Sequence, residues 1–316
     1  MNNYRVNVIT PPRRGGPFYW AKNLVKLLND NGITSHHVYE IKDLIAAPFC
    51  QDADIVHAAL PLGIRFWKKK FVFTVKGDYS VERRRWRGLN SLAVKNADTV
   101  TTPSEYLKKR LDLADAHVIP NAIFSEKYRM VDHKDSSDIN LITVTNFAFR
   151  DKSEGILNII GLLEGLQKST DKKITFTIVG GGPYCSHVMK AAQGSRIPIR
   201  FTGFISDPRT ELEKSDIFLY HSPHDNFPNV FLEAMASGLP VVTNAVGASD
   251  EIISSGKTGF IANDDENYQE IVLRLISDTS LRADQGKNAR TRVETHFDWN
   301  CVVPEYIAIY TGLLSS

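Results

Sequence analysis

Two series of alternating strand-like and helix-like segments constrain the fold of this 316-residue chain. Short β-branched runs such as 5–10 and 71–75 are each followed by a segment with helical spacing of apolar residues, such as 18–29 and 81–95. This alternation indicates βαβ units and a parallel sheet. It restarts after the polar stretch 131–138, so the sequence predicts two α/β domains joined by a linker.

These breaks in the pattern give the expected domain boundaries. We expect residues 1–130 to form a first Rossmann-like domain, 131–138 to be the linker, and 139–300 to form a second Rossmann-like domain. The last helical stretch, 301–316, is amphipathic by its spacing. Open parallel sheets bind ligands at the carboxyl ends of their strands, so the functional site is expected in a cleft between the two domains.

The composition favours a folded protein of a reducing compartment. Apolar residues make up 42% of the chain and charged residues 23%, which argues against disorder. The three cysteines, Cys50, Cys185 and Cys301, are too dispersed for a disulfide framework or a zinc site. There is no leader-like N-terminus and no apolar run of bilayer length. We therefore expect a cytoplasmic protein, either free or peripheral on the inner face of the membrane.

The charge is distributed unevenly along the chain. Residues 1–125 hold 19 Lys and Arg against 11 Asp and Glu, whereas the remainder is net acidic. Basic and aromatic residues alternate in 65–71 and 83–87, a composition that suits an anionic membrane surface or a phosphorylated acceptor. A solvated helix face with snorkelling side chains explains the same residues. Nucleic acid is not an expected partner.

The stretch 225–242 sets two carboxylates, Asp225 and Glu233, around a predicted helix start and follows them with a strand. Pro228 predicts the first helical turn and Gly238 the end of the helix. Glu233 then lies about one and a half turns into the helix. Backbone N–H groups at a helix N-terminus attract phosphate. Carboxylates beside such groups suit a ligand with hydroxyls and a diphosphate, namely a sugar nucleotide.

This stretch resembles the acidic-x7-acidic signature of retaining family-4 glycosyltransferases, also called glycosyl transferases group 1. The signature is usually written Glu-x-Phe-Gly/Pro-x4-Glu-Ala-x-Ala-x-Gly-x-Pro-Val, and here Asp225 replaces its first Glu with a side chain one methylene shorter. The resemblance implies the GT-B fold, an α/β fold in which two doubly wound Rossmann-like domains face each other across a cleft. It further implies that the C-terminal helix, 301–316, crosses back to the first domain. It also implies that Asp225 contacts the donor sugar and Glu233 the ribose, with Phe227, Asn229 and Val230 in the same donor site. An ordinary helix–turn–strand with surface acids is the alternative.

Two cations after the first strand of the second domain are candidates for the diphosphate. Lys152 matches the lysine of the family's Glu-Lys-Gly segment, which neutralises the departing diphosphate where its charge develops. The family's arginine normally lies nearer Phe147, so Arg150 is a candidate replacement. With Asp225, these two residues form the predicted catalytic set. The alternative is a pair of exposed surface cations.

Glycine turns supply the other donor-binding candidates. Gly15 and Gly16 follow the first strand and open a helix, like the family's glycine-rich loop under the donor diphosphate, although a tight turn explains the pair equally well. Gly182 matches the family's Gly-x-Gly-Pro turn. Phe204 and Ile205 fit the segment that holds the nucleobase.

The acceptor side has four candidates in the first domain. Lys76 stands where many relatives have the histidine of Val-His-Gly, and we expect it to hold a phosphate. Asp78 or Glu82 would bind acceptor hydroxyls. His57 ends a strand and either faces the cleft or is a hydrogen-bonded structural histidine.

The residues and the resemblance together predict a retaining glycosyltransferase. It would move a hexosyl unit from a UDP- or GDP-sugar to a saccharide or lipid-linked acceptor in glycan or cell-envelope biosynthesis. The sugar nucleotide is a co-substrate, and neither a cofactor nor a metal is expected. Two alternatives stay open: a nucleotide-sugar epimerase of the same fold, which needs an acid/base pair at the sugar ring, and a non-catalytic module that binds sugar nucleotide or membrane.

Overall fold

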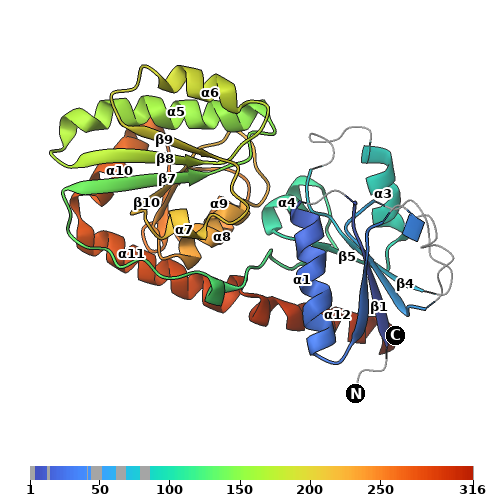
Figure 1. Cartoon of the computed structure of the whole chain (residues 1–316). Helices are drawn as coiled ribbons and strands as arrows, with labels where there is room; N and C mark the ends of the chain where they lie inside the picture. The colour runs from blue at the N-terminus through green and yellow to red at the C-terminus, as the bar shows by residue number, and fades with distance from the viewer. Residues whose placement is uncertain are drawn as a thin grey trace. The chain divides into compact units, whose positions relative to one another are not determined.

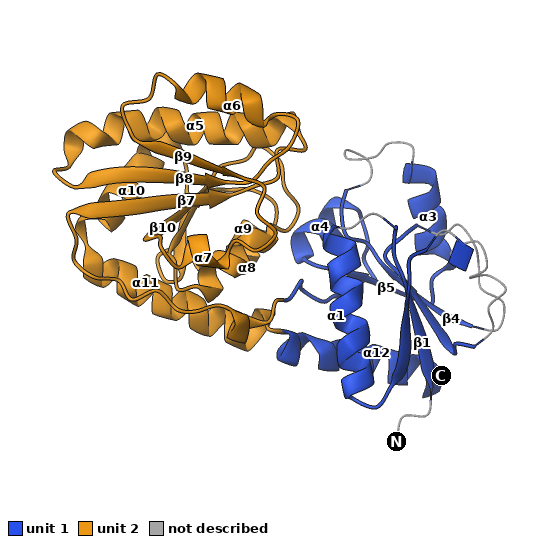
Figure 2. Ribbon diagram, in the orientation of Figure 1, with its two compact units in different colours: residues 1–122, 299–316 blue, residues 123–298 orange. Residues whose placement is uncertain are grey.

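The structure, a computed structural model, describes residues 4–12, 15–40, 42–43, 52–61, 69–78 and 86–315. The chain divides into two compact units (Figure 2), unit 1 with residues 1–122 and 299–316, and unit 2 with residues 123–298. Several features named from the sequence lie wholly or largely outside the described residues: Cys50, Glu82 and the basic-aromatic runs 65–71 and 83–87.

Unit 1 contains a six-stranded sheet with the order β2-β1-β3-β4-β5-β6, and every pair in it is parallel. Strands β3 and β4 are mostly apolar and almost entirely buried, as expected for a parallel sheet covered on both faces. The described elements are β1 (Arg5–Ile9), α1 (Gly16–Asp30), β2 (Thr34–Val38), β3 (Ile55–Ala58), β4 (Lys70–Thr74), α3 (Arg87–Asn96), β5 (Thr99–Thr102), α4 (Glu105–Arg110) and β6 (His117–Val118).

The C-terminal helix α12 (Trp299–Ser315) belongs to unit 1. It packs against α1, where Trp20 Nε1 donates a hydrogen bond of 3.2 Å to Tyr306 Oη. Tyr306 and Tyr310 have no exposed surface. The last helix therefore completes the core of the unit that the first residues begin.

Unit 2 contains a second parallel sheet, with the order β12-β11-β10-β7-β8-β9. Two sets of three strands run outward from the central pair β7 and β10, which is the doubly wound Rossmann order. Figure 1 shows α5 and α6 on one face of this sheet and α8 and α11 on the other. The expected pair of Rossmann-like units is thus confirmed in its secondary structure and strand order.

The elements of unit 2 have the following bounds. They are η2 (Ser125–Lys127), β7 (Asp138–Val144), α5 (Arg150–Leu166), η3 (Gln167–Ser169), β8 (Lys173–Val179), α6 (Cys185–Ala192), β9 (Ile199–Gly203), α7 (Arg209–Leu212), β10 (Ile217–Tyr220), α8 (Asn229–Ala236), β11 (Val241–Asn244), α9 (Ser249–Ile252), β12 (Gly259–Ala262), α10 (Asp265–Ser277), α11 (Thr279–Arg292) and the π-helical turn η4 (Val293–Phe297).

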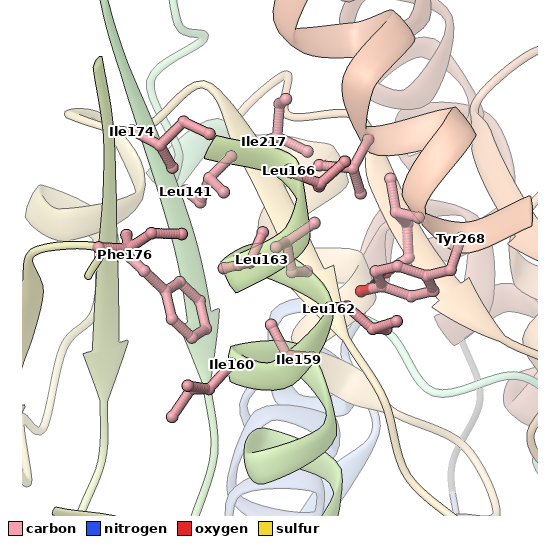
Figure 3. Close-up of a cluster of buried hydrophobic side chains, with 14 of the residues drawn as sticks. Leu141, Ile159, Ile160, Leu162, Leu163, Leu166, Ile174, Phe176, Ile217 and Tyr268 are labelled. Carbon is pink, nitrogen blue, oxygen red and sulfur yellow. Dashed lines mark hydrogen bonds between the residues drawn. The ribbon is translucent and has the colours of Figure 1, made fainter. Parts of the chain in front are cut away.

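The core of unit 2 fixes helix α5 on the sheet (Figure 3). Ile159, Leu163 and Leu166 recur at helical spacing on one face of α5 and are buried against sheet residues such as Phe176. Tyr268 closes this core, and its hydroxyl donates to the main-chain oxygens of β10 and β11 at 3.3 Å. Because α5 begins soon after β7, this packing places the first turn of α5 at the carboxyl edge of the sheet.

Some elements differ from the sequence prediction. Strands β2 and β12 and helices α10 and α11 had no predicted counterpart. Pro228 is the extended residue before α8, with ψ 98°, and not part of its first turn. Gly238 follows the helix with φ +74°, as a helix end requires. The predicted linker groups with unit 2, where the Val131 N–H donates to Ser237 O at 2.8 Å. In the described part of the chain, no helix combines the length and apolarity needed to cross a membrane.

Candidate functional site

The candidate site lies at the point in unit 2 where the strand order reverses. Strands β7 and β10 are neighbours, but the chain leaves β7 toward β8 on one side and leaves β10 toward β11 on the other. Loops from such a reversal diverge at the carboxyl edge and leave room for a ligand. Lys152 lies in the first turn of α5, after β7, and Asp225 lies in the loop after β10.

Lys152, Tyr220 and Asp225 form a hydrogen-bonded triad at this edge. Lys152 Nζ lies 2.5 Å from Asp225 Oδ2, and Tyr220 Oη donates to the same oxygen at 2.5 Å. The ammonium also donates to the Tyr220 hydroxyl. The Lys152 and Asp225 side chains keep 16% and 22% of their surface exposed. The triad is therefore sheltered from water yet open to a ligand.

Tyr220 was not predicted as a site residue. Burial, followed by the negative charge of Asp225, raises the pKa of Tyr220 well above its ordinary value, so its hydroxyl stays protonated and donates. Its ring packs edge-on against Phe231, with centroids 5.0 Å apart. The sequence shows Tyr220 only as the last residue of an apolar strand. The one usable signal was a hydroxyl at a strand's carboxyl end next to the acidic motif.

The loop that carries Asp225 is held by the neighbouring strand β11. Asn244 accepts from the Ser222 N–H at 3.0 Å and donates to the Ser222 carbonyl at 2.9 Å. Gly247 has φ +54°, and an added Cβ there would lie 2.5 Å from the Asp225 carbonyl oxygen. Only glycine allows this approach of the two loops. Asn244 and Gly247 are thus positioning residues that the sequence prediction missed.

Glu233 lies in α8 in a partly buried position. Burial, with a smaller contribution from the charge of Asp207, raises the pKa of Glu233 to about 7. Within the described residues, no hydrogen bond or ion pair holds this carboxylate. Its oxygens are available to accept from ligand hydroxyls.

The other residues of the acidic motif divide between packing and exposure. Phe227 is buried and its ring meets that of Phe297 with centroids 6.3 Å apart. Asn229, the first residue of α8, is exposed, and Val230 is partly exposed. Phe227 therefore packs beneath the surface and anchors the loop that carries Asp225. Asn229 and Val230 have surface that a ligand could contact.

The glycine turn after β8 lies directly against the loop after β7. Gly180 and Gly182 have φ of +143° and +151°, and an added Cβ on Gly182 would lie 2.6 Å from Phe147 O. Phe204, which follows β9 and abuts Gly181, is 80% exposed, and Ile205 is partly exposed. An aromatic ring this exposed beside two glycine turns offers a stacking surface.

Arg150, the first residue of α5, pairs with a residue outside the triad. Its side chain is 78% exposed, and its guanidinium pairs with Glu154 of the same helix at 2.8 Å. The role predicted for Arg150 at the diphosphate stays a prediction, because this pair matches the alternative of an exposed surface cation.

The candidates in unit 1 differ in access. Gly15 caps α1 and Gly16 begins it, and neither has an atom near an added Cβ. Lys76 follows β4, bonds Asn121 Oδ1 at 2.9 Å and lies 4.3 Å from the centre of the Trp20 ring. Burial lowers the pKa of Lys76 to about 7.

Two acceptor-side candidates, Asp78 and His57, have buried side chains that leave little or no surface for a ligand. Asp78 is 1% exposed and is paired with Arg110 at 2.7 Å. His57 has no exposed surface, and its ring nitrogens bond Tyr310 Oη and Thr74 Oγ1, each at 2.6 Å. Burial, reinforced by Lys76, lowers the pKa of His57 to about 3. His57 is therefore the structural histidine of the two readings.

Residues 139–278 match the family model described as glycosyl transferases group 1. This segment, which lies within unit 2, is therefore similar to that family. The chain is 26% identical over 251 residues to N-acetyl-alpha-D-glucosaminyl L-malate synthase of Bacillus anthracis, covering 72% of this chain and 63% of that protein. The capsular polysaccharide biosynthesis glycosyltransferase CapM of Staphylococcus aureus is 35% identical over 113 residues, which cover 35% of this chain and 30% of CapM. The chain thus spans less than two thirds of these relatives.

Solved structures of glycosyltransferases share the fold of this chain. Sucrose-phosphate synthase from Thermosynechococcus elongatus matches 99% of this chain and all of its own, with a TM-score of 0.83 at 16% identity. HepE from Anabaena, solved in complex with UDP and glucose, matches 98% of this chain and all of its own, with a TM-score of 0.77 at 15% identity. These matches confirm the α/β, GT-B-type fold.

Proposed function

We propose that this chain is a retaining glycosyltransferase that moves a hexosyl unit from a nucleotide-diphosphate sugar to a saccharide or lipid-linked acceptor. The observation that carries the proposal is the triad at the strand-order reversal, where an ammonium group and a carboxylate meet within reach of solvent. A UDP-sugar is the first donor to test, because HepE, which shares the fold, was solved with UDP-glucose. GDP-sugars are the second.

In the proposed reaction, the bond between the sugar's anomeric carbon and the phosphate oxygen breaks, and its electron pair stays on the phosphate. The acceptor hydroxyl oxygen bonds to the same face of that carbon, and its proton passes to the departing phosphate oxygen. Lys152 would neutralise the charge that develops on the diphosphate. Asp225 would accept from donor sugar hydroxyls, and Glu233 from the ribose.

The test measures nucleotide release from UDP- and GDP-sugars with and without saccharide and lipid-linked acceptors. Acceptor-dependent release, with product of unchanged anomeric configuration by NMR, supports the proposal. Isomerised sugar without net release would identify an epimerase. Donor binding without turnover would identify a binding module, and either result overturns the proposal.

The same assay tests two further expectations. Within the described ranges, no cluster of three or more His, Cys, Asp or Glu side chains is placed to hold a metal. Metal independence stays a prediction, which turnover in the presence of a chelator would support. Adding vesicles of anionic phospholipid to a sedimentation assay tests the proposed membrane surface as a partner.

The raised pKa of Glu233 predicts a pH dependence of donor binding. Below pH 7 this carboxyl becomes protonated in the empty site and loses one of its acceptors for ribose hydroxyls. We expect nucleoside diphosphate affinity to fall by up to about tenfold per pH unit below pH 7. Affinity falls as the pH falls because the ligand binds the charged, deprotonated form of Glu233.

The matched control for this prediction is Glu233→Gln, which keeps the shape but does not titrate. Calorimetric titration of UDP into both proteins compares their affinities between about pH 5.5 and 8.5. This range brackets the pKa of Glu233, which is about 7. The titration of the diphosphate itself cancels in this comparison. Equal pH profiles of the two proteins would show that Glu233 does not bind the ligand as a carboxylate.

A further inference from the structure

The shortened acid of the motif has an unusual partner in this chain. Asp225 Oδ2 lies 2.5 Å from both Lys152 Nζ and Tyr220 Oη, so two donors meet at one oxygen. Asp225 Oδ1 accepts from the Asn226 N–H at 2.8 Å. The carboxylate is therefore held on both oxygens, although its side chain is one methylene shorter than the Glu of the family signature.

Tyr220 is rigidly placed for this contact. It ends β10, is 4% exposed, and its ring packs against Phe231. A glutamate at position 225 would carry its carboxylate about 1.5 Å further out, since a carbon–carbon bond adds that length. With the Tyr220 hydroxyl only 2.5 Å from Oδ2, this oxygen occupies space that the longer side chain needs. Tyr220 and Asp225 fit each other as a pair.

The Tyr220 hydroxyl also accepts a hydrogen bond from the Lys152 ammonium, which donates to Asp225 as well. An ammonium has three N–H donors, and the structure assigns one to Asp225 and one to Tyr220. The third is left for a phosphate oxygen. These two hydrogen bonds fix the end of the flexible Lys152 side chain. Less conformational entropy is therefore lost when a phosphate binds to the ammonium.

We propose that Tyr220 is a positioning residue that compensates for the short Asp225 and orients Lys152 toward the leaving diphosphate. This inference rests on the proposed function and deepens it. Tyr220 touches neither donor nor acceptor in this scheme. Its effect passes through the two side chains that it bonds.

The test is a double-mutant cycle with Tyr220→Phe and Asp225→Glu. Tyr220→Phe removes one oxygen and keeps the ring packing. A hydrogen bond to a charged group supports an expected loss in kcat of about tenfold or more, with a smaller change in donor KM. Asp225→Glu alone should also lower kcat, because its carboxylate meets the Tyr220 hydroxyl. The double variant should regain most of the lost kcat, because the vacated space accepts the longer acid.

Tyr268→Phe is the matched control, because it removes a buried hydroxyl that bonds the main-chain oxygens of Tyr220 and Val242 but no side chain of the triad. It should change stability without changing kcat. Wild-type kcat in Tyr220→Phe, or a double variant no better than the weaker single variant, would overturn the inference alone. A wild-type protein that neither binds UDP nor turns over any donor would overturn the proposed function, and this inference with it.

Discussion

Replacing Lys152 with alanine is expected to lower kcat by about 10²–10³-fold, the usual effect of removing one positioned electrostatic group from a transition state. The ammonium lies 2.5 Å from Asp225 Oδ2, and the Lys152 side chain is only 16% exposed, a setting in which the charge is weakly screened. Its loss leaves the departing diphosphate without this cation. Because the diphosphate gains charge as the bond breaks, the effect should fall on kcat more than on donor KM.

The control for this prediction is a lysine in η3, the short helix that directly follows α5. Lys168→Ala removes an exposed lysine of η3, beyond the C-terminal end of α5. It should leave kcat within about twofold of the wild type, as exposed substitutions usually do. Steady-state rates of nucleotide release, with far-UV circular dichroism to check folding, measure both variants. If Lys152→Ala kept the wild-type rate, Lys152 would have no place in the mechanism.

The second prediction concerns the contact that positions α5. An added Cβ on Gly155 would lie 1.8 Å from the backbone oxygen of His221, at the end of β10. The His221 oxygen belongs to the backbone and not to a flexible side chain, so α5 must move to relieve the overlap. We expect Gly155→Ala to destabilise unit 2 by about 3 kcal/mol, the upper part of the range for overpacking. A displacement of about 1 Å at Lys152 would also lower kcat by about 10²-fold.

Gly161→Ala provides a control in the same helix with the opposite expected sign. No atom lies within 4 Å of an added Cβ on Gly161. Alanine should therefore stabilise the helix by up to about 1 kcal/mol through its better helix propensity. Urea unfolding followed by circular dichroism, with kcat measured in parallel, gives both values. Equal unfolding midpoints for the two variants would show that the Gly155–His221 contact does not position α5.

Much of the donor side could be predicted from the sequence because its signals are local. Asp225, Glu233 and Lys152 each follow a strand and lie beside a helix start, and the structure places all three on the loops and helices after β7 and β10. The elements that were missed had weak local patterns. Strand β2 reads Thr-Ser-His-His-Val, with polar residues where apolar ones are expected, and α11 is polar along most of its length.

Whether a ligand can reach a candidate side chain could not be predicted in the same way. Asp78 follows strand β4 and His57 lies near the end of β3, as site residues often do, yet both are buried in unit 1. Their hydrogen-bond partners, Arg110 and Tyr310, lie 32 and 253 residues further along the chain. A pattern of neighbouring residues does not report such partners.

The sequence by itself determined the two parallel α/β units and the acidic motif, because strand and helix periodicity and glycine or proline boundaries are properties of neighbouring residues. Only the tertiary structure decided which side chains meet. It brought Tyr220 to Lys152, 68 residues away, and Gly155 against the end of β10. These contacts depend on strand order and on close packing of distant segments, which no local pattern encodes.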